Sequence, residues 1–156
     1  MVLADTDCIP LDPYYLSAKA REYDFHTKFI ELAADINEQM PYYAAERIAE
    51  VVNGLKGRNI LVLGITYKKD VADTRESPAL KLMDILADKG AVVTFHDPFY
   101  PDKSANLQIG LARADCVVIA VDHSTYDWKM IAANANLVFD CKGVTRMLKS
   151  KHVVQL

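Results

Sequence analysis

The chain has 156 residues with a formal net charge of −3, and 51% of its residues are hydrophobic and 25% are charged. This length allows one full domain, or one domain with an extension, and the composition argues against a disordered chain. The mild negative charge argues against non-specific binding to nucleic acid.

The N-terminal third is predicted to be helical after a short loop. Two prolines within residues 9–13 predict the loop, and apolar residues then recur at spacings of three and four from residue 14 to about residue 53. Pro41 predicts a break or a sharp kink, and Asn53-Gly54 predicts the end of the segment. Such an amphipathic segment cannot bury its apolar face alone. We expect it to pack on the following domain, on a second copy of itself, or on a part not contained in this sequence.

From residue 59 onward, apolar strands alternate with helices. Ser77-Pro78 predicts the start of the first of these helices, and Gly90 predicts its end. We expect strands at 59–65, 91–96, 116–121, 137–140 and 152–155, and helices at 78–89, 105–113 and 126–134. Strands that are nearly unbroken apolar runs are typical of a parallel sheet covered on both faces. The sequence therefore predicts an α/β fold, a doubly wound parallel sheet preceded by a helical segment.

Polar residues stand where the predicted strands end, and ligands of open parallel sheets bind beyond those ends. The loop 65–77 holds Lys68, Lys69 and Arg75 before a helix, which suits phosphate groups, although a solvated surface loop is an equal alternative. No GxGxxG follows Gly64, which argues against a self-sufficient NAD site. The other strand ends carry His96-Asp97, Asp122-His123-Ser124 and Asp140-Cys141-Lys142.

Single cysteines and histidines give weaker indications. Cys8 lies in the proline-rich loop and is a candidate nucleophile, although a lone cysteine is more often inert. Cys116 is predicted to fill the core, and structural roles are favoured for Cys141, His96 and His123. The three cysteines are too widely spaced for a disulfide framework, and their spacing matches no zinc motif, so we expect no metal.

The longest apolar run is too short to cross a bilayer, and the N-terminus has no basic region followed by an apolar stretch. We therefore expect a cytoplasmic chain that does not engage a membrane.

Two segments together resemble the UDP-glucose/GDP-mannose dehydrogenase family. Residues 8–16, CIPLDPYYL, are similar to the active-site loop of the family, and residues 64–80, GITYKKDVADTRESPAL, are similar to its nucleotide-sugar loop. The sequences of the two segments most resemble the bacterial UDP-N-acetyl-glucosamine or -mannosamine 6-dehydrogenase branch of this family. Family members have an N-terminal NAD-binding domain, a central helical dimerisation segment and a C-terminal Rossmann-like domain that binds UDP. This chain resembles the second half.

The resemblance implies a domain organisation. Residues 1–56 would be the active-site loop and the helical dimerisation segment, which favours a homodimer. Residues 57–156 would be the Rossmann-like domain that binds a UDP-sugar.

The resemblance also implies a reaction and its catalytic residues. The family oxidises a sugar C6 hydroxyl to a carboxylate by two hydride transfers to NAD, through a cysteine thiohemiacetal and a thioester. Cys8 matches the nucleophile, and Asp12 matches the residue that helps to orient the water and the proton transfers.

The binding residues are implied in the same way. Tyr67 and Lys68 match positions that contact UDP, and Arg75 matches an arginine that reaches NAD. Lys142 falls near a basic position that contacts the nucleotide.

The residues before Cys8 depart from the family pattern. The family has Gly-Gly-His or Gly-Gly-Ser there, whereas this chain has Asp5-Thr6-Asp7, and a neighbouring carboxylate disfavours a thiolate. We expect this chain alone to bind a UDP-sugar without turnover, because nothing in it supplies an NAD site. The alternative is a non-catalytic module that binds nucleotide-sugars or only dimerises. A flavodoxin-like FMN or receiver domain is disfavoured, because the first strand is followed neither by an acidic pair nor by a glycine-rich phosphate loop.

Overall fold

The computed structural model describes residues 12–148 and 152–156. The described residues form two compact units, one of residues 12–40 and one that begins at Pro41 and ends at Leu156. Helix α2 (Lys28–Val51) contributes its first half to the former unit and its second half to the latter. The predicted division into 1–56 and 57–156 stays a prediction about function.

In the unit of residues 12–40, α1 (Asp12–Arg21) is followed by a turn over residues 22–27 and by the first half of α2. Asp24 adopts the left-handed conformation, with φ 56°, within this turn. Glu31 ties the two helices together, because it accepts hydrogen bonds from the Ser17 hydroxyl (2.9 Å) and from the Arg21 guanidinium. These two hydrogen bonds lower the pKa of Glu31.

The helical segment is therefore interrupted at residues 22–27. Of the break or sharp kink predicted at Pro41, the break is wrong, because α2 runs through Pro41 without ending. A proline costs a helix one backbone hydrogen bond and some crowding, which a long helix can absorb when its flanking turns are packed. Ala44, Ala45 and Ile48, in the turns that follow, are almost fully buried. Residues 22–27 lack apolar periodicity and include an aspartate, a residue type that tolerates left-handed backbone.

The second unit contains a five-stranded sheet with the order β2-β1-β3-β4-β5 and with every neighbouring pair parallel. The strands are β1 (Asn59–Leu63), β2 (Val92–His96), β3 (Cys116–Ile119), β4 (Val138–Asp140) and β5 (Val153–Gln155). The register places Ile60 opposite Val93 on β2 and opposite Cys116 on β3. The predicted α/β fold with a parallel sheet is confirmed.

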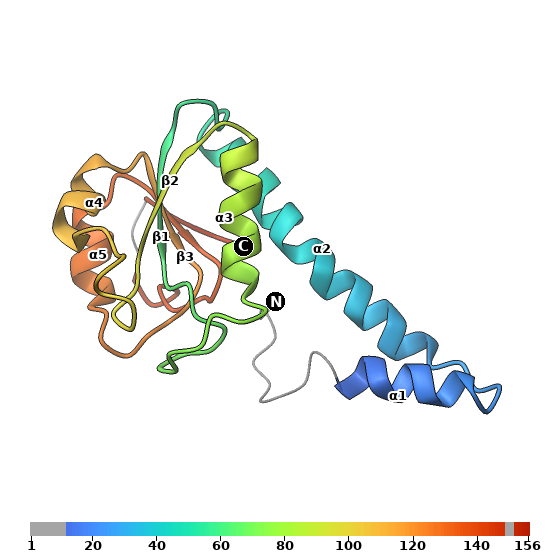
Figure 1. Ribbon diagram of the computed structural model, residues 1–156. Helices are drawn as coiled ribbons and strands as arrows, with labels where there is room; N and C mark the ends of the chain where they lie inside the picture. Colours follow the sequence, from blue (N-terminus) through green and yellow to red (C-terminus); the bar gives the residue numbers. More distant parts are fainter. Residues whose placement is uncertain (1–11, 149–151) are drawn as a thin grey trace. The chain divides into compact units, whose positions relative to one another are not determined.

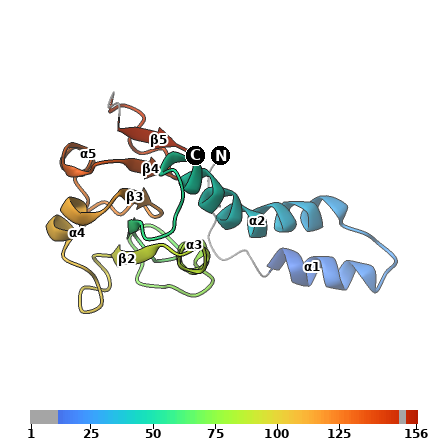
Figure 2. The same ribbon diagram turned by 90° about the horizontal axis from the view of Figure 1, so that it is seen from above.

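Helices cover both faces of this sheet, as Figures 1 and 2 show. Helices α4 (Leu107–Arg113) and α5 (Trp128–Asn134) lie on one face. Helix α3 (Pro78–Asp88) lies on the other, together with the part of α2 that follows Pro41, and the Lys81 ammonium on α3 lies 5.2 Å from the Tyr42 ring centroid. The predicted helices and strands of this unit are all present, with ends that differ by at most two residues from prediction.

The core lies between the sheet and the two helix layers. On the sheet face that α4 and α5 cover, alternate residues of β1, β3 and β4 are fully buried and pack with Leu111 of α4 and Ile131 of α5. These strand residues are Leu61, Leu63, Val117, Ile119 and Val138. Cys116 and Cys141 are also buried, and burial raises the pKa of both thiols to about 12. The prediction that Cys116 fills the core is confirmed.

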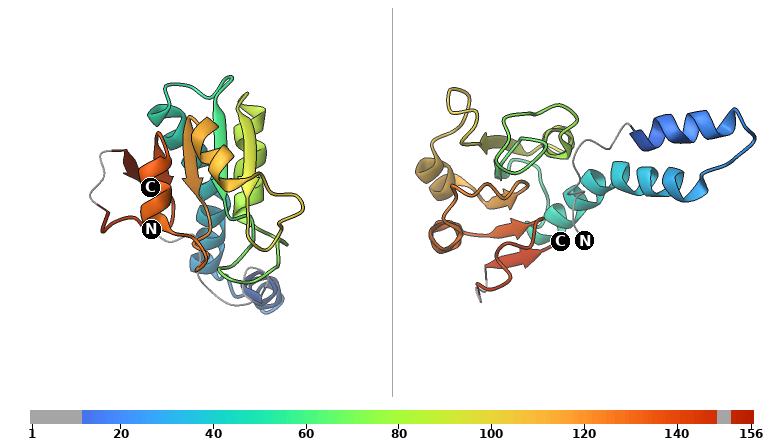
Figure 3. Two further views of the ribbon diagram at one scale, coloured as in Figure 1. Left: turned by 90° about the vertical axis from the view of Figure 1, so that its left-hand side faces the viewer. Right: turned by 90° about the horizontal axis from the view of Figure 1, so that it is seen from below.

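The strand order creates a point where neighbouring connections leave in opposite directions. The chain leaves β1 toward α3 on one face and leaves β3 toward α5 on the other. The topological switch point of the sheet therefore lies at the carboxyl ends of β1 and β3, which is where doubly wound folds bind their ligands. Figure 3 (right) looks onto this edge of the sheet.

No helix in the described part of the chain is long and apolar enough to cross a membrane.

Candidate functional site

The turn after β1 passes very close to the chain after β3. Gly64 has a φ of +82°, and a Cβ atom built on it would lie 2.4 Å from Cβ of Val121. The Gly64 amide donates to the His96 carbonyl at 2.9 Å, which also ties the turn to the end of β2. Gly64 is therefore required for packing at the carboxyl edge of the sheet.

A buried carboxylate organises this turn. Asp97, at the end of β2, is fully buried, and its Oδ2 accepts hydrogen bonds from the amides of Ile65 (2.7 Å) and Thr66 (3.3 Å). Its Oδ1 accepts from the Phe99 amide at 2.8 Å. Burial alone would raise the pKa of Asp97, but the hydrogen bonds from His123 and from these amides outweigh it and hold the pKa below its usual value.

His123 connects this carboxylate to the far end of the turn. The ring is fully buried, and its Nδ1 accepts a hydrogen bond from the Asp70 amide at 3.0 Å. The remaining ring nitrogen, Nε2, therefore carries the proton and lies 3.2 Å from both Asp97 Oδ2 and Thr66 Oγ1. The Thr66 hydroxyl in turn donates to the Lys68 carbonyl at 2.9 Å.

Asp70 fastens the same turn to the residues after β3. Its two carboxylate oxygens accept hydrogen bonds from the Ser124 amide (2.8 Å) and hydroxyl (2.7 Å), and these bonds lower the pKa of Asp70. Asp70 itself has a left-handed φ of 57°. Next to it, the Lys69 ammonium lies 3.6 Å from an Asp122 carboxylate oxygen. The turns after β1 and β3 thus behave as one hydrogen-bonded assembly.

Tyr67 and Lys68 lie in the middle of this turn, and both are half-buried. The Tyr67 amide donates to the Asp73 carbonyl at 2.7 Å, which folds the loop back on itself. The structure thus places these two predicted binding residues in a constrained turn at the carboxyl end of β1. The alternative of a solvated surface loop stays open, because residues 69–72 of the same loop are exposed.

Arg75 lies farther along the loop, and its side chain is 87% exposed. Its guanidinium forms hydrogen bonds to both carboxylate oxygens of Asp73, the shortest of them 2.6 Å. Hydrogen bonds from the Arg75 side chain lower the pKa of Asp73 to about 2. Ser77 then caps α3 by accepting from the Ala79 amide and donating to the Thr66 carbonyl.

The turn after β1 can be compared with the turns that bind NAD in other α/β folds. A dinucleotide-binding turn needs glycines that let the backbone approach the pyrophosphate. Loop 65–77 contains no glycine, and at Gly64, just before it, the space that a side chain would need is occupied by Val121. The turn after β1 therefore does not have the form of a dinucleotide-binding turn, and Arg75 is exposed farther along the loop. The residues that the structure describes include no cluster able to hold a metal ion.

A second buried carboxylate fixes the loop that carries Lys142. Asp140, at the end of β4, is 1% exposed and accepts hydrogen bonds from the amides of Lys142 (2.9 Å), Gly143 (2.7 Å) and Thr145 (2.8 Å). The Thr145 hydroxyl also donates to it. Lys142 therefore lies on the same carboxyl edge of the sheet as Lys68.

The two predicted catalytic residues, Cys8 and Asp12, are not among the residues described above at the carboxyl edge of the sheet. Cys8 lies outside the described residues, and Asp12 is the first residue of α1, in the unit of residues 12–40. Their roles stay predictions.

The network around His123 was missed by the sequence reasoning, which treated each strand end separately. The reason is that only the strand order reveals that the turns after β1, β2 and β3 adjoin. His123 does have the fully satisfied structural environment that was favoured for it.

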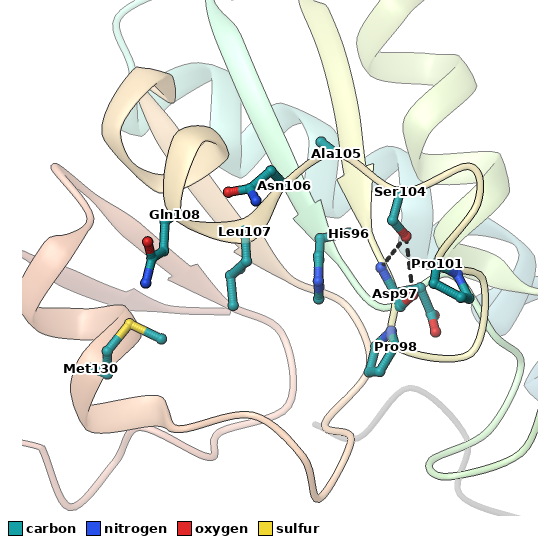
Figure 4. A pocket seen from close by; sticks show the side chains of 10 residues that line it. All are labelled: His96, Asp97, Pro98, Pro101, Ser104, Ala105, Asn106, Leu107, Gln108 and Met130. Carbon is teal, nitrogen blue, oxygen red and sulfur yellow. Dashed lines mark hydrogen bonds between the residues drawn. The ribbon is translucent and has the colours of Figure 1, made fainter.

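A cavity of about 700 Å³ opens beside this network, between the end of β2 and the start of α4 (Figure 4). Apolar side chains, among them Leu107 and Met130, form much of its lining. His96 also lines it, and its Nδ1 lies 3.0 Å from the Tyr126 hydroxyl; burial lowers the pKa of His96. The Ser104 hydroxyl on its rim binds the backbone of Asp97, as the dashed lines in Figure 4 show.

Comparison with known proteins identifies related sequences. A family model described as "UDP-glucose/GDP-mannose dehydrogenase family, UDP binding domain" matches residues 61–147. The UDP-N-acetyl-D-mannosamine dehydrogenase of Methanococcus vannielii is 35% identical over 127 residues, which cover 76% of this chain and 28% of that protein. The enzyme of the same name from Pyrococcus horikoshii is 37% identical over 131 residues, which cover 80% of this chain and 31% of that protein. The chain spans less than a third of the length of these two relatives.

Solved structures show the same likeness. UDP-D-ManNAc dehydrogenase from Pyrococcus horikoshii superposes with a TM-score of 0.80 at 30% identity, over 96% of this chain and 37% of that one. The UDP-N-acetyl-mannosamine dehydrogenase Cap5O from Staphylococcus aureus superposes with a TM-score of 0.72 at 28% identity, over 97% of this chain and 37% of that one.

Proposed function

Because the chain belongs to the UDP-glucose/GDP-mannose dehydrogenase family, we propose that it is the UDP-binding part of a UDP-N-acetylhexosamine 6-dehydrogenase. One observation carries the proposal. Lys68 lies within the matched residues, in a turn that buried polar groups hold at the carboxyl end of β1. The names of the related mannosamine dehydrogenases support an N-acetylhexosamine as the sugar.

Lys68 and Lys142, at the carboxyl edge of the sheet, would bind the diphosphate. A diphosphate carries concentrated negative charge, and a lysine ammonium binds it as a point charge with hydrogen-bond donors. Lys68 and Lys142 are both half-buried, and the backbone of each is fixed through a buried aspartate network. Tyr67 offers its ring as a contact for the nucleotide beside Lys68.

In the whole protein, the C6 alcohol of the sugar would be oxidised to an aldehyde, which the thiol of Cys8 would trap as a thiohemiacetal. After a second oxidation, water would hydrolyse the resulting thioester, which releases the uronic acid and restores the thiol. Asp12 would orient that water and take up its proton. The family is NAD-dependent, and we assign to Arg75 a contact with NAD held by residues other than those described here. We expect residues 1–156 alone to bind a UDP-sugar without turnover.

A calorimetric titration of the 156-residue chain with UDP-N-acetylmannosamine, and with UDP alone, tests this proposal. Lys68→Ala is expected to weaken binding of both about tenfold, because a charge-assisted contact is lost. Lys89→Ala is the matched control, since Lys89 is an exposed lysine at the end of α3. Equal affinity of the wild-type chain and Lys68→Ala would refute the role of Lys68. If the chain reduced NAD in the presence of the UDP-sugar, the prediction that it binds without turnover would be refuted.

The second candidate function is a non-catalytic module that binds nucleotide-sugars or only dimerises. It is favoured by the apolar surface of α1 and the first half of α2, where Phe29 is 84% exposed and Leu32 is 57% exposed. Other large apolar side chains exposed in this unit are Tyr15, Leu16, Tyr23, Phe25 and Ile36. Monomeric proteins rarely expose so much apolar surface, so we propose a homodimer through this segment in either function. A chain that dimerises but binds neither UDP nor UDP-sugar would support the dimerisation module.

A further inference from the structure

We propose that His123 is the positioning residue of the nucleotide site, which holds the Lys68 turn in its binding geometry without touching the ligand. This inference rests on the proposed function, because it concerns the same site. His123 lies in the turn after β3, whereas the lysine that it would position lies in the turn after β1. Three observations support the inference: the placement of the hydrogen bonds, the burial of the ring and the tautomer that the bonds require.

The hydrogen bonds of His123 bracket Lys68 on both sides. On one side, Nδ1 accepts from the Asp70 amide at 3.0 Å, two residues after Lys68. On the other side, Nε2 lies 3.2 Å from the Thr66 hydroxyl, two residues before Lys68, and that hydroxyl donates to the Lys68 carbonyl at 2.9 Å. One imidazole ring therefore sets the backbone of the turn at each end of the tripeptide that carries the lysine.

The ring acts through the turn because it cannot reach a ligand. His123 is 0% exposed, and the Phe99 ring packs against it with 4.9 Å between the ring centroids. Its Nε2 proton is also oriented by Asp97 Oδ2 at 3.2 Å, so the ring cannot turn without losing a contact to a buried carboxylate.

This arrangement matters for affinity because a lysine has a long and flexible side chain. Binding must order that side chain, and a backbone that is already fixed lowers the entropic cost of doing so. Without His123, the Asp70 amide and the Thr66 hydroxyl would each lose a buried partner, and the turn would sample other conformations before binding.

Two substitutions test the contributions of the two ring nitrogens separately. In His123→Asn, the amide oxygen can take the place of Nδ1 and accept from Asp70, while the contacts to Asp97 and to the Thr66 hydroxyl are lost; that hydroxyl can still donate to the Lys68 carbonyl. In His123→Gln, the amide nitrogen can take the place of Nε2 and donate to Asp97, while the contact to Asp70 is lost. His26→Asn and His26→Gln are the matched controls, because His26 is exposed in the turn between α1 and α2.

The readouts are UDP affinity by calorimetry and the midpoint of thermal unfolding. If His123 positions the turn, His123→Gln is expected to bind UDP about fivefold more weakly, because the Asp70 anchor is lost, while His123→Asn stays within about twofold of the wild-type chain. Thermal stability is expected to follow the opposite order, because His123→Asn removes the side-chain ring that donates to the buried Asp97 and leaves its hydrogen bonds to backbone amides. Affinities that follow thermal stability in both variants would refute the positioning role.

A third readout keeps the inference distinct from the proposed function. Hydrogen exchange of the Asp70 amide is expected to be slow in the wild-type chain and in His123→Asn, and about tenfold faster in His123→Gln. If the wild-type chain binds no UDP, the proposed function fails, whereas equal Asp70 exchange in all three proteins would overturn the positioning role. If a histidine variant does not fold, Thr66→Val removes the hydroxyl that joins His123 Nε2 to the Lys68 carbonyl, and it is expected to weaken UDP binding. UDP binding unchanged by Thr66→Val would overturn the role as well.

Discussion

Gly64→Ala is the substitution that tests most directly how the site is assembled. A Cβ at this position would lie 2.4 Å from Cβ and 2.9 Å from the carbonyl oxygen of Val121, and it would sit on a backbone with a φ of +82°. The left-handed conformation costs an alanine about 1–2 kcal/mol, and the clash adds about 1–3 kcal/mol. We therefore expect a loss of about 2–5 kcal/mol from a total stability of about 5–15 kcal/mol.

Gly57→Ala separates these two contributions. Gly57 also has a positive φ, +75°, but a Cβ there would meet no atom within 4 Å. It should therefore lose about 1 kcal/mol, because the backbone strain is partly offset by the smaller entropy of the unfolded chain. The difference between the two variants measures the close approach of the turns after β1 and β3.

Urea unfolding followed by circular dichroism gives the free energies of both variants. The fluorescence of Trp128, the single tryptophan of the chain, gives a second probe near these turns. UDP binding by Gly64→Ala should also weaken, since the Lys68 turn is displaced from its anchors. Equal stability of Gly64→Ala and Gly57→Ala would refute the reasoning, because it would show that the two turns can separate at no cost.

Three further predictions follow from buried and exposed groups. The folded-state pKa of Asp97 is lowered, so its contribution to stability is present above about pH 4, the usual pKa of an aspartic acid, and is lost as the pH falls through the folded-state pKa. Asp97→Asn should therefore flatten the acid side of the stability–pH curve, and a curve as steep as that of the wild-type chain would contradict this. Burial raises the pKa of Cys116 and Cys141 to about 12, so iodoacetamide at pH 8 should label neither thiol in the folded protein, as mass spectrometry would show; labelling without denaturant would disprove the burial. If the chain forms the proposed homodimer, Phe29→Glu should convert it into a monomer in sedimentation experiments, because the substitution puts a charge on the proposed interface; an unchanged mass would exclude that interface.

The sheet was predictable because its signals are local. Each strand is a short apolar run, and Ser77-Pro78 marks the start of α3 through a capping hydroxyl that the structure contains. The helical segment was harder, because Pro41 is a strong local signal that the packed turns after it override. The true interruption at residues 22–27 has no proline or glycine to mark it.

The site was predictable in part for the same reason. The rule that ligands bind at carboxyl strand ends placed Lys68 and Lys142 on one edge of the sheet, and the structure has them there. The contacts of Asp97 and His123 could not be predicted, because they join turns that are more than 25 residues apart in sequence. Those contacts depend on strand order, which a single sequence does not specify.

The loop after β4 shows how such a site can change its preference while keeping its shape. Asp140 holds this loop mainly through main-chain amides, and every residue except proline carries an amide. The hydrogen bond from the amide of residue 142 to Asp140 therefore does not depend on which side chain this residue carries. A single mutation at residue 142 can therefore change the group that the loop presents to the proposed nucleotide site while the backbone hydrogen bonds to Asp140 remain.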